Sequence, residues 1–235
     1  MKDTMISFGP LDIPTYVIGE EDNAEKILYL HGSNTSRERQ IPICKKLSAM
    51  TNRTIILPEY SGHGEMKSQV GQTTPSLHAL EAITVYDWIN KTSDEKNICV
   101  YGGSYGAYLA AQLCKYRNPG QLILQAPSIL LPNEFYTPWS ILNNRKTTRK
   151  KLTYEELLAL RHPLMVRLAS SFHGAIALIE MQKDDKISHD LLSVWRYYLP
   201  KAQYYLIKNG LHSINDSPKN SQDQFLKVIA EAISS

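Results

Sequence analysis

The chain has 235 residues, of which 43% are hydrophobic and 21% are charged, a composition typical of an ordinary globular protein with one sizeable core. Its 26 basic and 23 acidic residues give a net charge of +3. Such a mild excess provides no argument for a nucleic acid or a membrane surface as partner. We therefore expect one domain over residues 1–235 that binds no nucleic acid.

The cysteines and the N-terminus bear on the cellular compartment. Cys44, Cys99 and Cys114 are widely spaced and odd in number, so neither a disulfide framework nor a zinc site is indicated. The first twelve residues lack the apolar region of a signal peptide, and no apolar run approaches the roughly 18 residues that span a bilayer. We expect a cytoplasmic protein without stable membrane insertion.

Short aliphatic runs alternate along the chain with longer segments of helical period. This alternation predicts the α/β class, with a mostly parallel central sheet covered by helices on both faces. Strands are expected at residues 16–18, 26–30, 54–57, 97–101, 121–124, 175–179 and 202–207, with a further edge strand at 4–8.

Helices are expected at residues 37–50, 75–90, 107–117, 191–198 and 221–233. The clearest is 75–90, because Thr74 can cap its N-terminus and Pro75 suits a first turn. We expect one apolar face of this helix to pack on the sheet. That face consists of Leu77, Leu80, Ile83, Trp88 and Ile89.

No strand is evident at about 127–172, and an insertion of this length is usually functional or mobile. We interpret it as a helical cap that selects the substrate and contains a short helix in TYEELLALR. Its apolar residues form either an acyl pocket or the cap's own core. They are Ile129, Leu130, Leu131, Phe135, Tyr136, Trp139, Ile141 and Leu142.

A basic run within the same insertion carries the strongest local charge bias. It comprises Arg145, Lys146, Arg149, Lys150 and Lys151. Such a run usually forms a solvated face. The sharper hypothesis is attraction of an anionic substrate or acyl carrier.

The segment Gly102-Gly103-Ser104-Tyr105-Gly106 follows the expected strand NICVY and precedes the helix-favouring AYLAA. This is the strand, turn and helix context of a G-x-S-x-G nucleophile elbow. Glycines at its ends leave room for the chain to reverse, so that the serine hydroxyl can project above the sheet. A glycine-rich turn without catalysis is the alternative. A phosphate-binding loop is disfavoured because GxxxxGK[ST] is absent.

Serine needs a base, and His212 is the candidate because it follows the last expected strand and would emerge at the same edge of a parallel sheet as Ser104. The orienting acid should follow the preceding strand, where Asp184 and Asp185 are adjacent. A carboxylate there can fix the tautomer of the imidazole and stabilise its charged form. Asp184 is the first choice and Asp185 the reserve.

Acyl transfer also needs hydrogen-bond donors for the oxyanion. The backbone N–H of Tyr105 lies at the expected helix start, and a second donor should come from the loop His31-Gly32-Ser33-Asn34. Ser33 is the preferred residue. The alternative for the His-Gly pair is a simple glycine turn.

With these motifs in this order, the chain resembles the α/β-hydrolase superfamily over nearly its whole length. The segment LPEYSGHGE at 57–65 is similar to the G-H-G segment of esterases, monoacylglycerol-lipase-like proteins and serine aminopeptidases. In that family this loop shapes the site rather than taking part in the chemistry, and Asp184 matches the family's D-x-x-V acid pattern through Ile187.

The resemblance implies a serine hydrolase that needs neither metal nor cofactor and acts on a small-molecule acyl substrate through Ser104, His212 and Asp184. A carboxylesterase, lipase-like enzyme or thioesterase is the leading hypothesis. Two alternatives remain: a peptidase or amidase with the same triad, and a non-catalytic binding protein of this fold.

Overall fold

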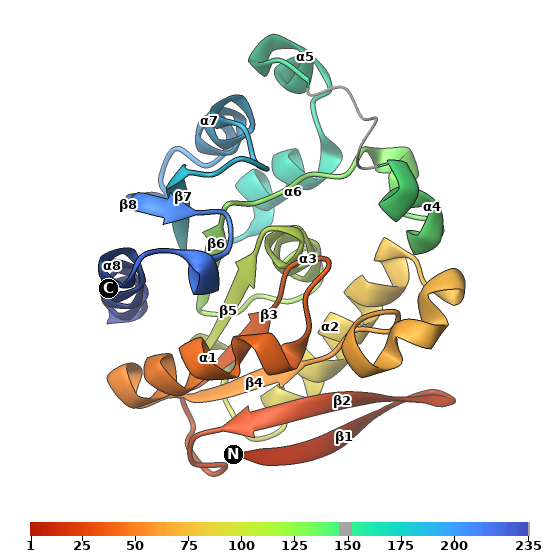
Figure 1. Cartoon of the computed structure of the whole chain (residues 1–235), viewed down its shortest axis with the longest axis vertical. Helices are drawn as coiled ribbons and strands as arrows, with labels where there is room; N and C mark the ends of the chain where they lie inside the picture. Colours follow the sequence, from red (N-terminus) through yellow and green to blue (C-terminus); the bar gives the residue numbers. More distant parts are fainter. Residues whose placement is uncertain (146–151, 235) are drawn as a thin grey trace.

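The computed structural model describes residues 1–145 and 152–234, with only the backbone described at 143–145. Within these residues, eight strands form one sheet in the order β1-β2-β4-β3-β5-β6-β7-β8 (Figure 1). The strands are β1 (Lys2–Phe8), β2 (Leu11–Ile18), β3 (Lys26–Leu30), β4 (Thr54–Pro58), β5 (Ile98–Gly103), β6 (Gln121–Gln125), β7 (Ala175–Lys183) and β8 (Gln203–Leu211). Only the pairs β1–β2 and β2–β4 are antiparallel in this part of the chain.

Helices cover both faces of the sheet. They are α1 (Arg37–Thr51), α2 (Pro75–Asn90), α3 (Tyr105–Leu113), α4 (Trp139–Arg145), α5 (Tyr154–Ala159), α6 (Pro163–Ser171), α7 (His189–Tyr198) and α8 (Lys219–Ser234). Alternate residues along the central strands enter two different cores. Leu28 and Val100 face the core with α2 and α3, whereas Ile27 and Cys99 face the core with α1 and α8.

The predicted fold class is confirmed, because the sheet is mostly parallel and covered by helices on both faces. Each expected strand is present. The helix after the elbow spans Tyr105–Leu113 rather than 107–117, and α6 was not anticipated. Among the helices described, none is both long and apolar enough to cross a bilayer.

Helix α2 begins as expected, since the Thr74 side chain accepts a hydrogen bond from the backbone N–H of Leu77 at 3.2 Å. The expected buried face is right only in part. Ile89 is buried, and Ile83 and Trp88 pack against the core. Leu80 is 53% exposed, and His78 and Glu81 are buried instead. Tertiary hydrogen bonds explain the rotation, because His78 contacts the Tyr105 hydroxyl and Glu81 contacts Ser61.

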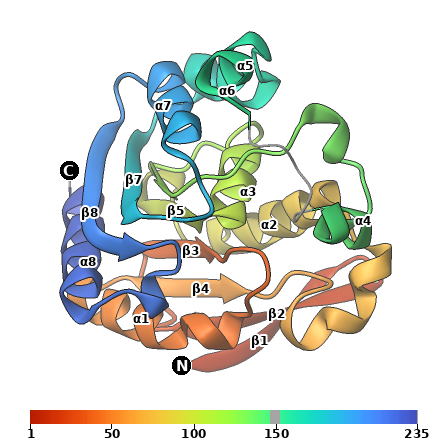
Figure 2. The ribbon, with the colours of Figure 1, turned by 45° about the horizontal axis from the view of Figure 1, so that its top comes forward.

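The insertion expected to form a cap joins β6 to β7. Its described helices form two groups (Figure 2). Helix α4 contacts the 3-10 helix η1 (Gly64–Gln72), whereas α5 and α6 both contact α7 and α6 also contacts α3. Helix α6 contributes Leu164, Met165 and Leu168 to the core that also contains α2 and α3. The cap boundaries at about 127–172 stay a prediction.

Two side-chain sets within this insertion were singled out from the sequence. Of the apolar set, Trp139 and Leu142 are buried in the core, whereas Tyr136 and Ile141 are exposed. Of the basic set, Lys146, Arg149, Lys150 and Lys151 lie outside the described residues, as does the side chain of Arg145.

A pair of substitutions on α2 tests its orientation. Ile89→Ala removes a side chain that is 0% exposed, and we expect the free energy of unfolding to fall by about 2–5 kcal/mol. Leu80→Ala truncates an exposed side chain and should change that free energy by at most about 0.5 kcal/mol. Urea unfolding measures both, and equal losses would contradict the orientation described here.

Candidate active site

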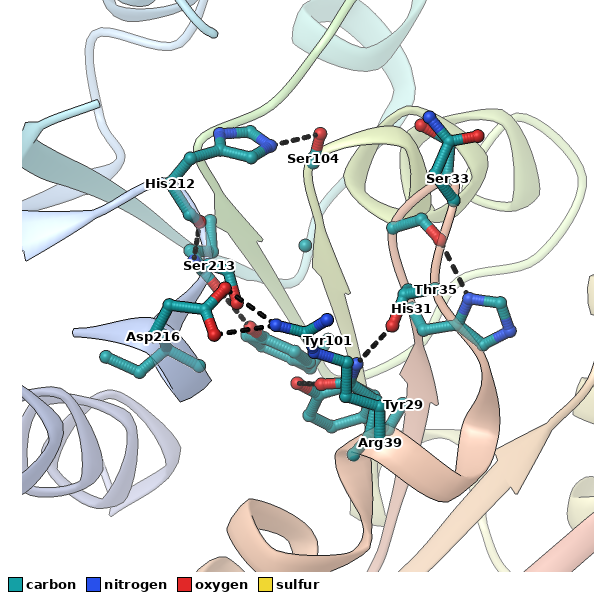
Figure 3. Close-up of a pocket in the computed structure, with 16 residues that line it drawn as sticks. Tyr29, His31, Ser33, Thr35, Arg39, Tyr101, Ser104, His212, Ser213 and Asp216 are labelled. Carbon is teal, nitrogen blue, oxygen red and sulfur yellow. Dashed lines mark hydrogen bonds and ion pairs between the residues drawn. The ribbon is translucent and has the colours of Figure 1, made fainter. Parts of the chain in front are cut away.

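Three polar side chains named from the sequence meet at the carboxyl edge of the parallel strands. Ser104 follows β5, Asp184 follows β7 and His212 follows β8. Parallel strands end at a common edge, so residues distant in sequence become neighbours there. Figure 3 shows Ser104 with His212 on one side and Ser33 on the other.

Ser104 occupies a sharp turn between β5 and α3. Its φ is +54°, a left-handed value that is costly for a residue other than glycine. The turn is held by the Ser104 N–H, which donates to the Gln125 carbonyl at 2.8 Å. An added Cβ would lie 2.3 Å from the Gly106 oxygen at Gly102, and 2.0 Å from the Leu30 oxygen at Gly106. The two glycines are therefore required by close packing.

A chain of hydrogen bonds joins the three side chains. The Nε2 atom of His212 lies 3.0 Å from Oγ of Ser104. Its Nδ1 atom lies 2.9 Å from each carboxylate oxygen of Asp184. This arrangement can remove a proton from the serine while the carboxylate holds the imidazole in the required orientation.

The two adjacent acids have different surroundings. Asp184 has a side chain only 6% exposed, and its Oδ1 accepts the backbone N–H groups of Lys186 and Ile187 at 2.8 and 2.9 Å. The Asp185 side chain is 69% exposed and pairs with Lys186, whose hydrogen bond lowers the pKa of Asp185. The structure thus brings Asp184, and not Asp185, to His212.

The residues expected to supply oxyanion donors lie beside Ser104. The backbone of Tyr105 begins α3, directly after the turn. The loop of Ser33 also approaches the serine closely, because a Cβ added to Gly32 would lie 3.6 Å from Cβ of Ser104. Ser33 lines the same cavity as Ser104. Both named residues are therefore near the serine.

A buried polar cluster lies behind this edge. The His78 Nδ1 atom is 2.8 Å from the Tyr105 hydroxyl, and its Nε2 atom is 2.9 Å from the Ser61 carbonyl oxygen. Burial lowers the pKa of His78 to about 4, and it raises the pKa of Glu81 to about 7. Both side chains are therefore held in a packed environment where charge is disfavoured.

A cavity of about 220 Å³ opens beside Ser104 and His212. Most of the residues that line it carry a polar group, and Ile214 is the one purely aliphatic side chain among the lining residues described. Arg39 and Asp216 both line the cavity and form an ion pair, with Nη2 of Arg39 2.6 and 2.7 Å from the carboxylate oxygens (Figure 3). None of the apolar side chains proposed for an acyl pocket, from Ile129 to Leu142, lines this cavity.

The sequence interpretation missed several polar residues that support the site. The Gln125 Nε2 group donates to the His212 carbonyl at 3.4 Å, and Gln40 Nε2 donates to the Thr35 hydroxyl at 3.0 Å. Glu59, noted within a segment that shapes the site, contacts the side chain of His31. A polar residue at the end of a buried strand, as at Gln125, or directly after it, as at Glu59, is the signal that could have indicated these two.

Comparison with solved structures places the fold among known enzymes. An esterase of Pyrococcus furiosus matches with a TM-score of 0.72 and 14% identity, over 99% of this chain and 91% of that one. A thioesterase domain from the curacin biosynthetic pathway matches with a TM-score of 0.68 and 13% identity, over 100% and 99%. The chain has the α/β-hydrolase fold. The resemblance drawn from the motifs is thereby confirmed at the level of the fold.

Curated relatives match part of the chain. Lysophosphatidylserine lipase ABHD12 of Xenopus tropicalis is 31% identical over 124 residues, which are 49% of this chain and 31% of the relative. The corresponding protein of Gallus gallus is 28% identical over the same length. The chain thus spans about a third of the length of these relatives. No protein-family model matches the chain.

Proposed function

We propose that the protein is a serine hydrolase that cleaves a carboxylic ester or thioester through an acyl-enzyme on Ser104. One observation carries this proposal: Ser104, His212 and Asp184 form an unbroken hydrogen-bonded chain, with contacts of 3.0 and 2.9 Å. The α/β-hydrolase fold supports it, because a strained serine between strand and helix is the usual nucleophile position of that fold. Fold alone would not carry the activity.

The reaction follows from the geometry. His212 Nε2 takes the proton of Ser104 as Oγ attacks the carbonyl carbon, and the backbone amides of Ser33 and Tyr105 bind the oxyanion. The protonated His212 then gives its proton to the departing alcohol or thiol, which leaves an acyl group on Oγ. Water attacks the acyl-enzyme with His212 again as base, releasing the acid and restoring Ser104. Asp184 keeps the imidazole aligned throughout.

The comparisons support ester cleavage over other reactions of the fold. The similar solved structures include esterases and a thioesterase domain, and the curated relative is a lipase.

Cys44, Cys99 and Cys114 are free and buried, and for this reason we also propose the reducing cytoplasm as the protein's location.

Replacement of the nucleophile tests the proposal directly. Ser104→Ala should lower kcat by about 10⁴-fold or more, because no other group can form the acyl-enzyme. Turnover of p-nitrophenyl butyrate and labelling by a fluorophosphonate probe measure this loss. A wild-type protein that is neither labelled nor active on esters, thioesters or aminoacyl amides would be a binding protein instead. Turnover of the amides alone would indicate a peptidase.

The two adjacent acids provide a matched pair. Asp184→Asn leaves the shape of the side chain intact but presents the wrong hydrogen-bonding group to His212, so kcat should fall by about 10⁴-fold. Asp185→Asn changes an exposed charge and should alter kcat by less than about threefold. Steady-state kinetics on one ester compares them, and a reversed order would move the role to Asp185.

The cavity beside Ser104 indicates the size of the group that enters it. At about 220 Å³ it is smaller than a site for a drug-sized ligand, which occupies about 300–1,000 Å³. Most of its lining residues carry a polar group, and a long alkyl chain is disfavoured there because the polar groups that it covers lose their contact with water.

We therefore expect short acyl groups to be preferred. The kcat/KM for p-nitrophenyl acetate or butyrate should exceed that for the decanoate by on the order of tenfold. Assays below the micelle-forming concentration of the decanoate provide the comparison. A value that rises steadily through the decanoate would place the acyl chain outside this cavity, against the insertion between β6 and β7.

A further inference from the structure

The loop from His31 to Ser36 joins β3 to α1 and carries Ser33; we call it the oxyanion loop. Its backbone lies against the nucleophile, as the contact of Gly32 with Ser104 shows. Backbone donors stabilise a developing charge only when they are held in the right place before the reaction. The contacts that restrain this loop therefore affect the rate of acyl transfer as well as the stability of the fold.

One carboxylate contacts both ends of the oxyanion loop. Oε1 of Glu59 is 2.8 Å from Nε2 of His31, and both side chains are 0% exposed. The geometry of this contact is that of an ion pair rather than of a directed hydrogen bond. Oε2 of Glu59 accepts the backbone N–H of Arg37, the first residue of α1, at 3.0 Å. Glu59 itself follows β4 directly.

Each end of the loop is further anchored to the body of the protein. The His31 ring packs on the Tyr60 ring with centroids 4.4 Å apart. The Arg37 guanidinium bonds Asp3 and Glu65 at 2.7 and 2.6 Å. Between these two anchors, Gln40 donates to the hydroxyl of Thr35. The loop is thus held by the residues that directly follow β4 and by residues of α1.

Burying a carboxylate costs free energy, because the charged group loses its contact with water. Breaking such a pair is strongly destabilising, yet an apolar side chain of similar volume often gives equal or greater stability. What the carboxylate provides, and an apolar group does not, is a charged contact with His31 and a hydrogen bond from the Arg37 N–H, both made by one rigid group. This property suits the alignment of a loop more than the stability of the core.

We propose that Glu59 is a positioning residue for acyl transfer, which holds His31 and the Arg37 amide so that the Ser33 amide stays directed at the oxyanion. This role rests on the proposed function of Ser104. Glu59 itself touches no reacting atom. Its effect should therefore appear in the transition state and leave substrate binding largely unchanged.

Glu59→Gln tests the role, because the amide has similar size and keeps an oxygen acceptor for the Arg37 N–H but removes the carboxylate charge that faces His31. We expect kcat for p-nitrophenyl butyrate to fall by on the order of 10- to 100-fold, with KM changed by less than about twofold. The Ser104 hydroxyl adds to the carbonyl of an alkyl trifluoromethyl ketone to form an oxyanion. The affinity of Glu59→Gln for this ketone should fall by the same factor as its kcat/KM.

Glu81→Gln is the matched control. Glu81 is a buried carboxylate of the same sheet edge, but its contacts are to the backbone N–H and hydroxyl of Ser61 and not to the oxyanion loop. We expect a lower melting temperature with kcat and ketone affinity within about twofold of the wild type. The concentration of active enzyme is set by phosphonate titration in every variant, so that unfolded protein does not count as lost kcat.

Two outcomes would overturn the role of Glu59. One is a titrated Glu59→Gln enzyme with wild-type kcat and ketone affinity, whatever its melting temperature. The other is an equal loss of kcat in Glu81→Gln, which would show a general effect of the buried cluster. If the wild type has no Ser104-dependent turnover, the proposed function is refuted and the role of Glu59 falls with it.

Discussion

Helix α3 approaches the end of β3 so closely that an added Cβ at Gly106 would lie 2.0 Å from the Leu30 oxygen. This packing places the start of α3 beside the first residues of the oxyanion loop. It also sets the position of Ser104, whose Oγ lies 3.0 Å from His212. The strained turn at Ser104 persists because packing and the hydrogen bond to Gln125 hold it from both sides.

The carboxyl edge of the sheet carries polar groups of two kinds. Those that face the cavity include Ser104 and His212, and they are partly accessible. Those behind it, including Glu59 and His78, are buried and paired with protein groups. Because a buried polar group without partners is costly, this second set restricts the positions of the loops that it contacts.

Short aliphatic runs predicted each strand, because a strand covered by helices on both faces of the sheet is apolar on both sides. Helical periodicity was less successful on α2, where Leu80 is exposed and His78 and Glu81 are buried. Hydropathy cannot indicate that a histidine or a glutamate will find partners on another element. Likewise, Asp184 and Asp185 are adjacent residues of the same type, and their order in the sequence does not distinguish them. The backbone amides of Lys186 and Ile187 bind the Asp184 carboxylate, and Asp184 is the one that contacts His212.

By itself, the sequence determined the class of fold, the sharp turn at Ser104 and the meeting of Ser104, an aspartate and His212 at one edge of the sheet, since these depend on local pattern and on the rule that parallel strands end at one edge. Only the tertiary structure decided which acid meets His212, which residues line the cavity beside Ser104, and that Glu59 contacts both ends of the oxyanion loop. These features depend on contacts between residues far apart in the chain, about which the local pattern of residues carries no information.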